Sequence, residues 1–161
     1  MLTNEEPKLK LNNDNPYIIE IIELARSYVK QLKYDDAIKL YSSGIEFDHY
    51  YELYERRAFI YYKLGKFHDA IEDYSFLISN GINKPKYLRN RGALYKKTQQ
   101  YKKCKKDLLT LIEIYKVSND YESINYIEEE LAIINDLIKK DESISYSKKE
   151  ESKVKSNNDF N

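Results

Sequence analysis

The sequence is poor in residues that cross-link or interrupt a chain. Its 161 residues include one cysteine, three prolines, four glycines and no tryptophan. A single cysteine excludes a disulfide within the chain and is typical of a reducing compartment, so we expect an intracellular protein in the cytoplasm, with the nucleus as the alternative. The scarcity of proline and glycine favours an all-helical fold.

Charge of one sign and long apolar runs are also missing. The 27 basic and 27 acidic residues cancel, so no overall field attracts nucleic acid or a membrane surface. No stretch approaches the roughly 18 apolar residues that a membrane-spanning helix needs. The polar opening MLTNEEPKLKLNN has no apolar segment of the kind found in signal peptides. We therefore expect a soluble protein.

The chain does contain one pattern three times, at a spacing of 33–34 residues. Small residues occupy two positions of the pattern and aromatic residues occupy others. Such a repeat is typical of a helix–turn–helix unit that stacks on its copies, with small residues where two helices approach closely. The residues expected to pack the repeats are Ala25, Tyr28, Ala37, Ala58, Tyr61, Ala70, Tyr74, Gly92, Tyr95 and Cys104.

Helix boundaries follow from capping residues. Asn15 and Pro16 form a helix start, and Gly65 and Gly81 lie where helices should end. Asn119 with Glu122 suggests a capping box for a last helix. Helices are expected at about 16–32, 35–47, 51–64, 67–80, 85–98, 101–116 and 120–140.

The ends of the chain differ from its middle in composition. Residues 1–14 are polar and aperiodic, which predicts a flexible lead. Residues 141–161 are charged and rich in Ser and Asn, which predicts a disordered tail. The helix at 120–140 breaks the repeat but carries one apolar stripe, as expected of a capping helix that covers the last repeat.

The three units resemble the tetratricopeptide repeat (TPR). The second unit reads Tyr54-x2-Arg57-Ala58-x2-Tyr61, then Ala70-x3-Tyr74, against the pattern W-x2-L-G-x2-Y and A-x3-F. The resemblance implies an α-solenoid of about seven helices, a right-handed superhelix of antiparallel helix pairs. Its domain would span 15–140, with repeats at about 18–50, 51–84 and 85–118 and the cap at about 120–140.

The resemblance also implies a ligand groove on the first helices of the repeats. The positions that would face it include two acids, Glu52 and Glu55, but the set is centred on cations with one aromatic residue. Arg binds carboxylates in a bidentate manner, so we expect an acidic or C-terminal peptide segment of a protein partner. The expected groove residues are Arg26, Lys30, Arg56, Phe59, Lys63, Lys86, Arg89, Asn90 and Lys97.

Two further interpretations stay open. One TPR subclass holds the acidic C-termini of heat-shock chaperones, but of the equivalent positions only Lys86 matches in type, which leaves a chaperone cofactor with a degenerate carboxylate clamp. Residues 84–106 hold ten basic residues and no acid. This run indicates either an RNA-associated scaffold that uses the third repeat, or charge neutralisation by the acidic helix that follows.

Residue patterns for catalysis are not found. His49 and His68 have no Cys or His at metal-ligand spacing, Cys104 occupies a packing position, and no glycine-rich phosphate loop occurs. We therefore expect a protein-binding adaptor or scaffold that is not an enzyme and needs neither metal nor cofactor. Membrane binding is not expected and nucleic-acid binding is disfavoured, while the sequence leaves the oligomeric state undetermined.

Overall fold

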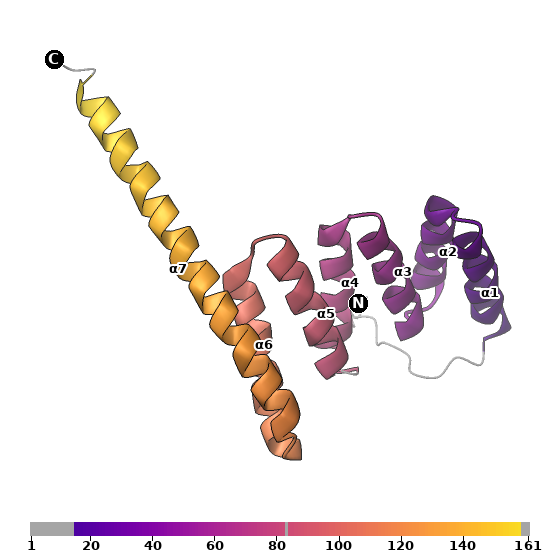
Figure 1. The fold of residues 1–161 in the computed structure, drawn as a ribbon. Coiled ribbons are helices and arrows are strands. Elements are labelled where there is room, and N and C mark those ends of the chain that lie inside the picture. Colours follow the sequence, from indigo (N-terminus) through magenta and orange to yellow (C-terminus); the bar gives the residue numbers. More distant parts are fainter. Residues whose placement is uncertain (1–14, 83, 159–161) are drawn as a thin grey trace, which may run out of the picture. The chain divides into compact units, whose positions relative to one another are not determined.

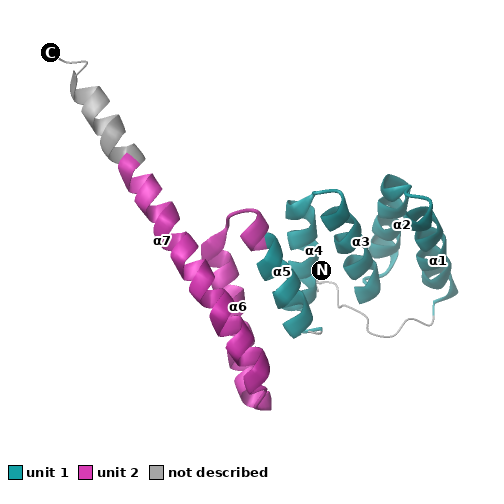
Figure 2. Ribbon diagram, in the orientation of Figure 1, with its two compact units in different colours: residues 1–94 teal, residues 95–161 magenta. Residues whose placement is uncertain are grey.

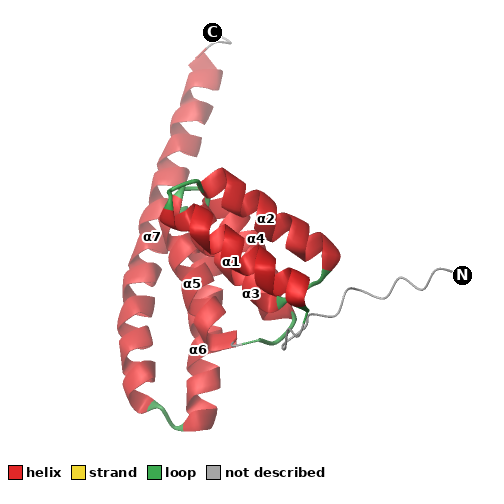
Figure 3. Cartoon of the chain, turned by 90° about the vertical axis from the view of Figure 1, so that its right-hand side faces the viewer, coloured by secondary structure: helices red, strands yellow, loops and turns green. Residues whose placement is uncertain are grey.

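The computed structural model describes residues 15–82 and 84–158, with side chains through residue 147 (Figure 1). The flexible lead expected at 1–14 lies outside the described residues. The described ranges form seven helices and no strand, which confirms the all-α class (Figure 3). The helices are α1 (Pro16–Lys30), α2 (Tyr34–Phe47), α3 (Tyr51–Lys63), α4 (Phe67–Ser79), α5 (Lys84–Lys97), α6 (Tyr101–Ser118) and α7 (Tyr121–Asn158).

The chain divides into two compact units, residues 1–94 and 95–161, with the division inside α5 (Figure 2). In the first unit α1 packs on α2, α2 on α3, and α3 on α4. Of the expected repeat-packing residues in the whole chain, Tyr28 and Tyr61 are half-buried and the others are buried. Four alanines of the first unit have no exposed surface at all, which leaves no room for a larger side chain: Ala25, Ala37, Ala58 and Ala70.

The first helix of each repeat ends in the same way. Leu32, Gly65 and Gln99 all have left-handed φ angles, of 60°, 72° and 58°. The next residue donates its backbone N–H to the carbonyl of the repeat tyrosine, at 2.9 Å for Tyr28 and Tyr61 and 2.8 Å for Tyr95. These bonds form a Schellman motif. Only the middle repeat places glycine, which tolerates this conformation without steric cost, at the left-handed position.

A buried charge pair ties three helices of the first unit together. Arg57 on α3 donates to both carboxylate oxygens of Asp73 on α4, at 3.0 and 2.7 Å, and to Ser42 Oγ on α2 at 2.8 Å. Asp73 lies in the middle of α4 and is 4% exposed, so its charge is balanced by Arg57 and not by the N-terminus of its own helix.

The second unit contains the α6–α7 hairpin. The expected stripe of α7 faces inward, with Ile124, Ile127 and Ile134 buried. Asp120, and not Asn119, caps α7, since its Oδ1 accepts from the Ser123 N–H at 3.1 Å while Asn119 ends α6 in a left-handed conformation.

The helix α7 runs 18 residues past the end expected at 140. The expected helix end, with a disordered tail from 141 onward, is therefore corrected for residues 141–158. No proline or glycine interrupts this segment, and its Glu and Lys residues favour a helix. Side chains 141–147 are all exposed, so local propensity rather than burial accounts for the extension.

Candidate functional site

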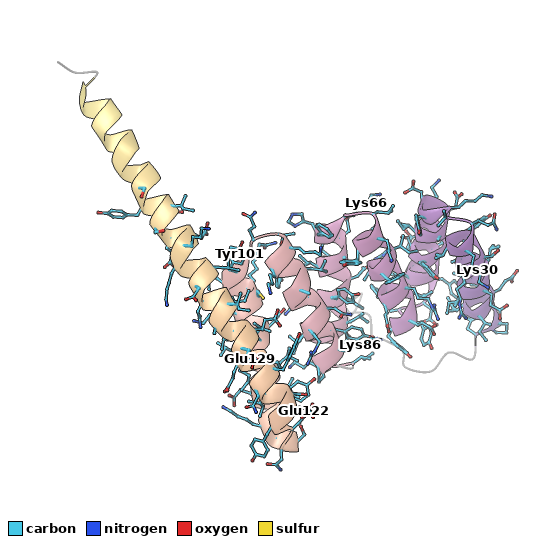
Figure 4. The ribbon with its side chains drawn as sticks, in the orientation of Figure 1. Lys30, Lys66, Lys86, Tyr101, Glu122 and Glu129 are labelled. Carbon is cyan, nitrogen blue, oxygen red and sulfur yellow. The ribbon has the colours of Figure 1, made fainter. Side chains whose placement is uncertain are left out.

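A groove of about 620 Å³ lies within the first unit. Residues from α1, α2, α3, α4 and α5 line the groove, so it spans more than one repeat. Figure 4 labels Lys30 on α1 and Lys86 on α5, which are both part of its lining. The lining residues are Arg26, Val29, Lys30, Tyr41, Tyr51, Glu52, Glu55, Arg56, Phe59, Ile60, Tyr74, Lys86 and Asn90.

The structure brings six of the nine expected groove residues together: Arg26, Lys30, Arg56, Phe59, Lys86 and Asn90. Lys63 lies beside the groove, with its Nζ 5.3 Å from the centre of the Phe59 ring. Arg89 is exposed and does not line the groove, and Lys97 belongs to the second unit. These last two are therefore not members of the groove.

Tyrosines of the second helices form an inner wall that the expected set did not contain. Tyr41 on α2 and Tyr74 on α4 are 1% and 6% exposed and line the groove together with Ile60. Burial raises the pKa of Tyr41, and the positive charges of Arg56 and Arg26 oppose this shift. Tyr74 was expected only to pack the repeats, and Tyr41 occupies the equivalent position of the first repeat.

Phe59 differs from that wall because half of its surface, 50%, is open to solvent. An exposed aromatic side chain at the mouth of a groove offers apolar contact to a ligand without rearrangement. The wall and Phe59 together give the groove an apolar lining between its charged groups.

The carboxylates of Glu52 and Glu55 change the charge of the groove. Glu52 Oε1 accepts from Arg56 Nε at 2.6 Å and forms an ion pair with its Nη2. Glu55 forms an ion pair with Lys86, and its other oxygen accepts from the hydroxyl of the buried Tyr87 at 2.9 Å. The expected cationic centre is therefore neutralised by the protein's own acids.

The two cations on α1 are in a different state. Within the described part of the chain, neither Arg26 nor Lys30 makes a hydrogen bond or an ion pair, and both are exposed. At its α1 end the groove therefore has two positive side chains without an ion pair to the described residues, which we call the uncommitted pair. On α3 and α5 the cations of the groove are paired with the protein's own glutamates.

Other chemistry finds little support among the described residues. No group of three or more His, Cys, Asp or Glu side chains there could hold a metal ion, and no described helix is long and apolar enough to cross a membrane. His49 Nδ1 lies 2.5 Å from the Tyr54 hydroxyl. Burial raises the pKa of Cys104 to about 11, which leaves its thiol protonated and unreactive at neutral pH.

Comparisons with known proteins agree with this architecture. The solved first TPR domain of human RPAP3 is 30% identical, with a TM-score of 0.58, over 79% of this chain and 96% of that domain. The chain belongs to the TPR family. The TPR solenoid expected from the sequence is thereby confirmed, although no family model matches the chain.

Two further solved structures have a similar fold. The first TPR of Spaghetti (RPAP3), bound to the HSP90 peptide SRMEEVD, is 28% identical with a TM-score of 0.59 and covers 80% of this chain and 98% of that one. Yeast Tom70 shares the fold at 18% identity and a TM-score of 0.67, over 86% of this chain and 27% of that one.

Among curated proteins, human RNA polymerase II-associated protein 3 is 29% identical over 123 residues, or 76% of this chain. The chain spans 18% of the length of that relative. The similarity therefore concerns one segment of a longer protein.

Proposed function

We propose that this TPR domain is a non-catalytic protein-binding module that takes an extended peptide segment with a carboxylate into the groove of its first unit. The observation that carries the proposal is the uncommitted pair Arg26 and Lys30 beside an apolar wall that ends in the exposed Phe59. A guanidinium and an ammonium group bind a carboxylate, while the wall accepts an apolar side chain. The proposed repeats are 18–50, 51–84 and 85–118, followed by a capping helix.

The test is a titration of labelled SRMEEVD peptide followed by fluorescence anisotropy. Arg26→Gln with Lys30→Gln should weaken binding by about ten-fold or more, because charge-assisted bonds to the carboxylate are lost. Lys39→Gln with Lys139→Gln is the matched control, because it removes the same two charges at side chains that are 80% and 77% exposed and do not line the groove. Equal affinity for the wild type and the double variant would exclude this end of the groove as the site.

A chaperone tail is the more specific candidate for the partner. The RPAP3 structure that resembles this chain holds an HSP90 peptide, which favours the chaperone-cofactor alternative over an unspecified partner. Because only Lys86 matches the usual clamp residues in type, the clamp would be a degenerate one. If the candidate is right, a C-terminally amidated SRMEEVD peptide should bind much more weakly than the free acid. Such a role places the protein in the cytoplasm or nucleus.

The RNA-scaffold alternative has less to support it. In the second unit Lys96 pairs with Glu130 at 3.3 Å and Lys102 with Glu142 at 2.8 Å, so the basic run is partly neutralised by α7. RNA binding would show as a steep loss of affinity with increasing salt concentration.

A further inference from the structure

The groove carries two acids at the place where an acidic ligand would be expected to bind. Glu52 and Glu55 lie three residues apart on α3, so both face the groove from the same side of one helix. Their side chains are 26% and 28% exposed. At this burial their charges are screened less by salt than those of a fully exposed pair.

Each of these acids already forms an ion pair with a cation of the groove, so that cation is not available to a further carboxylate of the ligand. Arg56 donates both Nε and Nη2 to Glu52, and Lys86 is paired with Glu55. An incoming carboxylate at this section must displace one of these acids or lie beside it with like charge. Either event costs binding free energy, because a like charge at close range disfavours the complex.

Hydrogen bonds from two tyrosines also hold the acids in place. The Tyr87 hydroxyl donates to Glu55, and the Tyr50 hydroxyl donates to Glu52 at 3.3 Å. Tyr87 has no exposed surface, so displacing Glu55 would leave a buried hydroxyl without its acceptor. The acids are therefore a fixed part of the groove.

We propose that Glu52 and Glu55 are specificity-determining residues that favour peptides whose acidic groups are confined to the C-terminal residue. The carboxylates of that residue bind at Arg26 and Lys30, and the neighbouring ligand residues that face Glu52 and Glu55 are uncharged. Tails with several consecutive acids bind less well than neutral ones. This inference rests on the proposed function, since it assigns the ligand class of the same groove.

The experiment compares two labelled peptides with free C-termini, SRMEEVD and the variant SRMQQVD. Wild-type protein should bind SRMQQVD more tightly, by about five-fold, as expected for loss of two partly screened repulsions. Glu52→Gln with Glu55→Gln should remove this preference and tighten binding of SRMEEVD. Gln keeps an acceptor oxygen for Tyr87 and Tyr50, and circular dichroism checks that the variant folds.

A matched control separates local from overall charge. Glu20→Gln with Glu46→Gln changes the net charge by the same amount at exposed positions outside the groove, and it should leave the peptide preference unchanged.

The possible outcomes separate the two proposals. If the wild-type protein binds SRMEEVD more tightly than SRMQQVD, the inference is overturned and no variant needs to be measured. The proposed function remains intact in that case. Equal gains in the control and the groove variant overturn it as well, since the effect would then be one of net charge. If neither peptide binds wild type or variant, the proposed function and the inference both fail.

Discussion

Replacing Asp73 with leucine should destabilise the first unit by about 3 kcal/mol. The carboxylate is 5% exposed and receives two hydrogen bonds from Arg57, so its removal strands a guanidinium inside the stack. Breaking a buried pair from one side typically costs about 3–5 kcal/mol. We take the lower end because the Arg57 side chain is 18% exposed and retains some contact with water.

The double variant Arg57→Met with Asp73→Leu tests the physical reason. It removes both charges, so it should cost less than about 1 kcal/mol relative to wild type. The free energy of unfolding is measured for wild type and the single and double variants by urea titration with circular dichroism. A double variant as unstable as Asp73→Leu would refute the argument, since the loss would then come from packing and not from the unpaired charge.

The pH dependence of the stability of the single variant Arg57→Met gives a second check. Burial raises the pKa of Asp73, and Arg57 opposes that shift. Arg57→Met should therefore raise the pKa further. A carboxyl group with a higher pKa in the folded than in the unfolded state takes up a proton on folding, so this variant should gain stability as the pH falls through the raised pKa of the folded state towards the pKa of the unfolded chain.

Three other predictions concern the backbone, the tyrosines and the C-terminal segment. Leu32→Gly should stabilise the protein by about 0.5–1 kcal/mol in urea titrations, because it relieves a left-handed leucine, and Gly65→Ala should do the opposite. Burial raises the pKa values of Tyr50 and Tyr54 to about 12, so these hydroxyls ionise at a lower pH in the unfolded chain than in the folded protein. The melting temperature should therefore fall as the pH rises above about 10. A constant melting temperature up to about pH 12 would contradict this. Deleting residues 141–161 should leave the melting temperature unchanged, because side chains 141–147 are exposed, and a clear fall would show that α7 is held beyond residue 140.

The fold could be predicted from the sequence because the repeat places small residues and aromatic residues at several equivalent positions in each unit. The repeat pattern together with the capping residues predicted six of the helices to within two residues at each end. The Schellman ends at Leu32 and Gln99 were not accessible, because neither residue prefers the left-handed conformation by itself. The turn from the first to the second helix of each repeat uses this conformation, and of the three residues at these turns only Gly65 indicates it in the sequence.

The groove was predictable in its location but not in its charge state. Helical periodicity indicates which residues share a face, and Arg56 and Lys86, which were expected on one face, both line the groove. Whether a lysine points to a ligand or to a neighbouring glutamate depends on side-chain contacts between residues 31 apart, as for Lys86 and Glu55. Arg89 and Asn90 are adjacent, so a rotation of one residue around α5 separates a groove residue from a solvent-facing one.

The unpaired state of Arg26 and Lys30 has a consequence for how this domain can change. No hydrogen bond or ion pair to the described residues depends on them, so their exchange costs the fold little. Arg56 and Lys86 are constrained, because altering either strands a glutamate. New ligand preferences can therefore arise by mutation of α1 alone, while α3 and α5 retain their residues. Among related domains, partner choice should vary with the first helix of the stack.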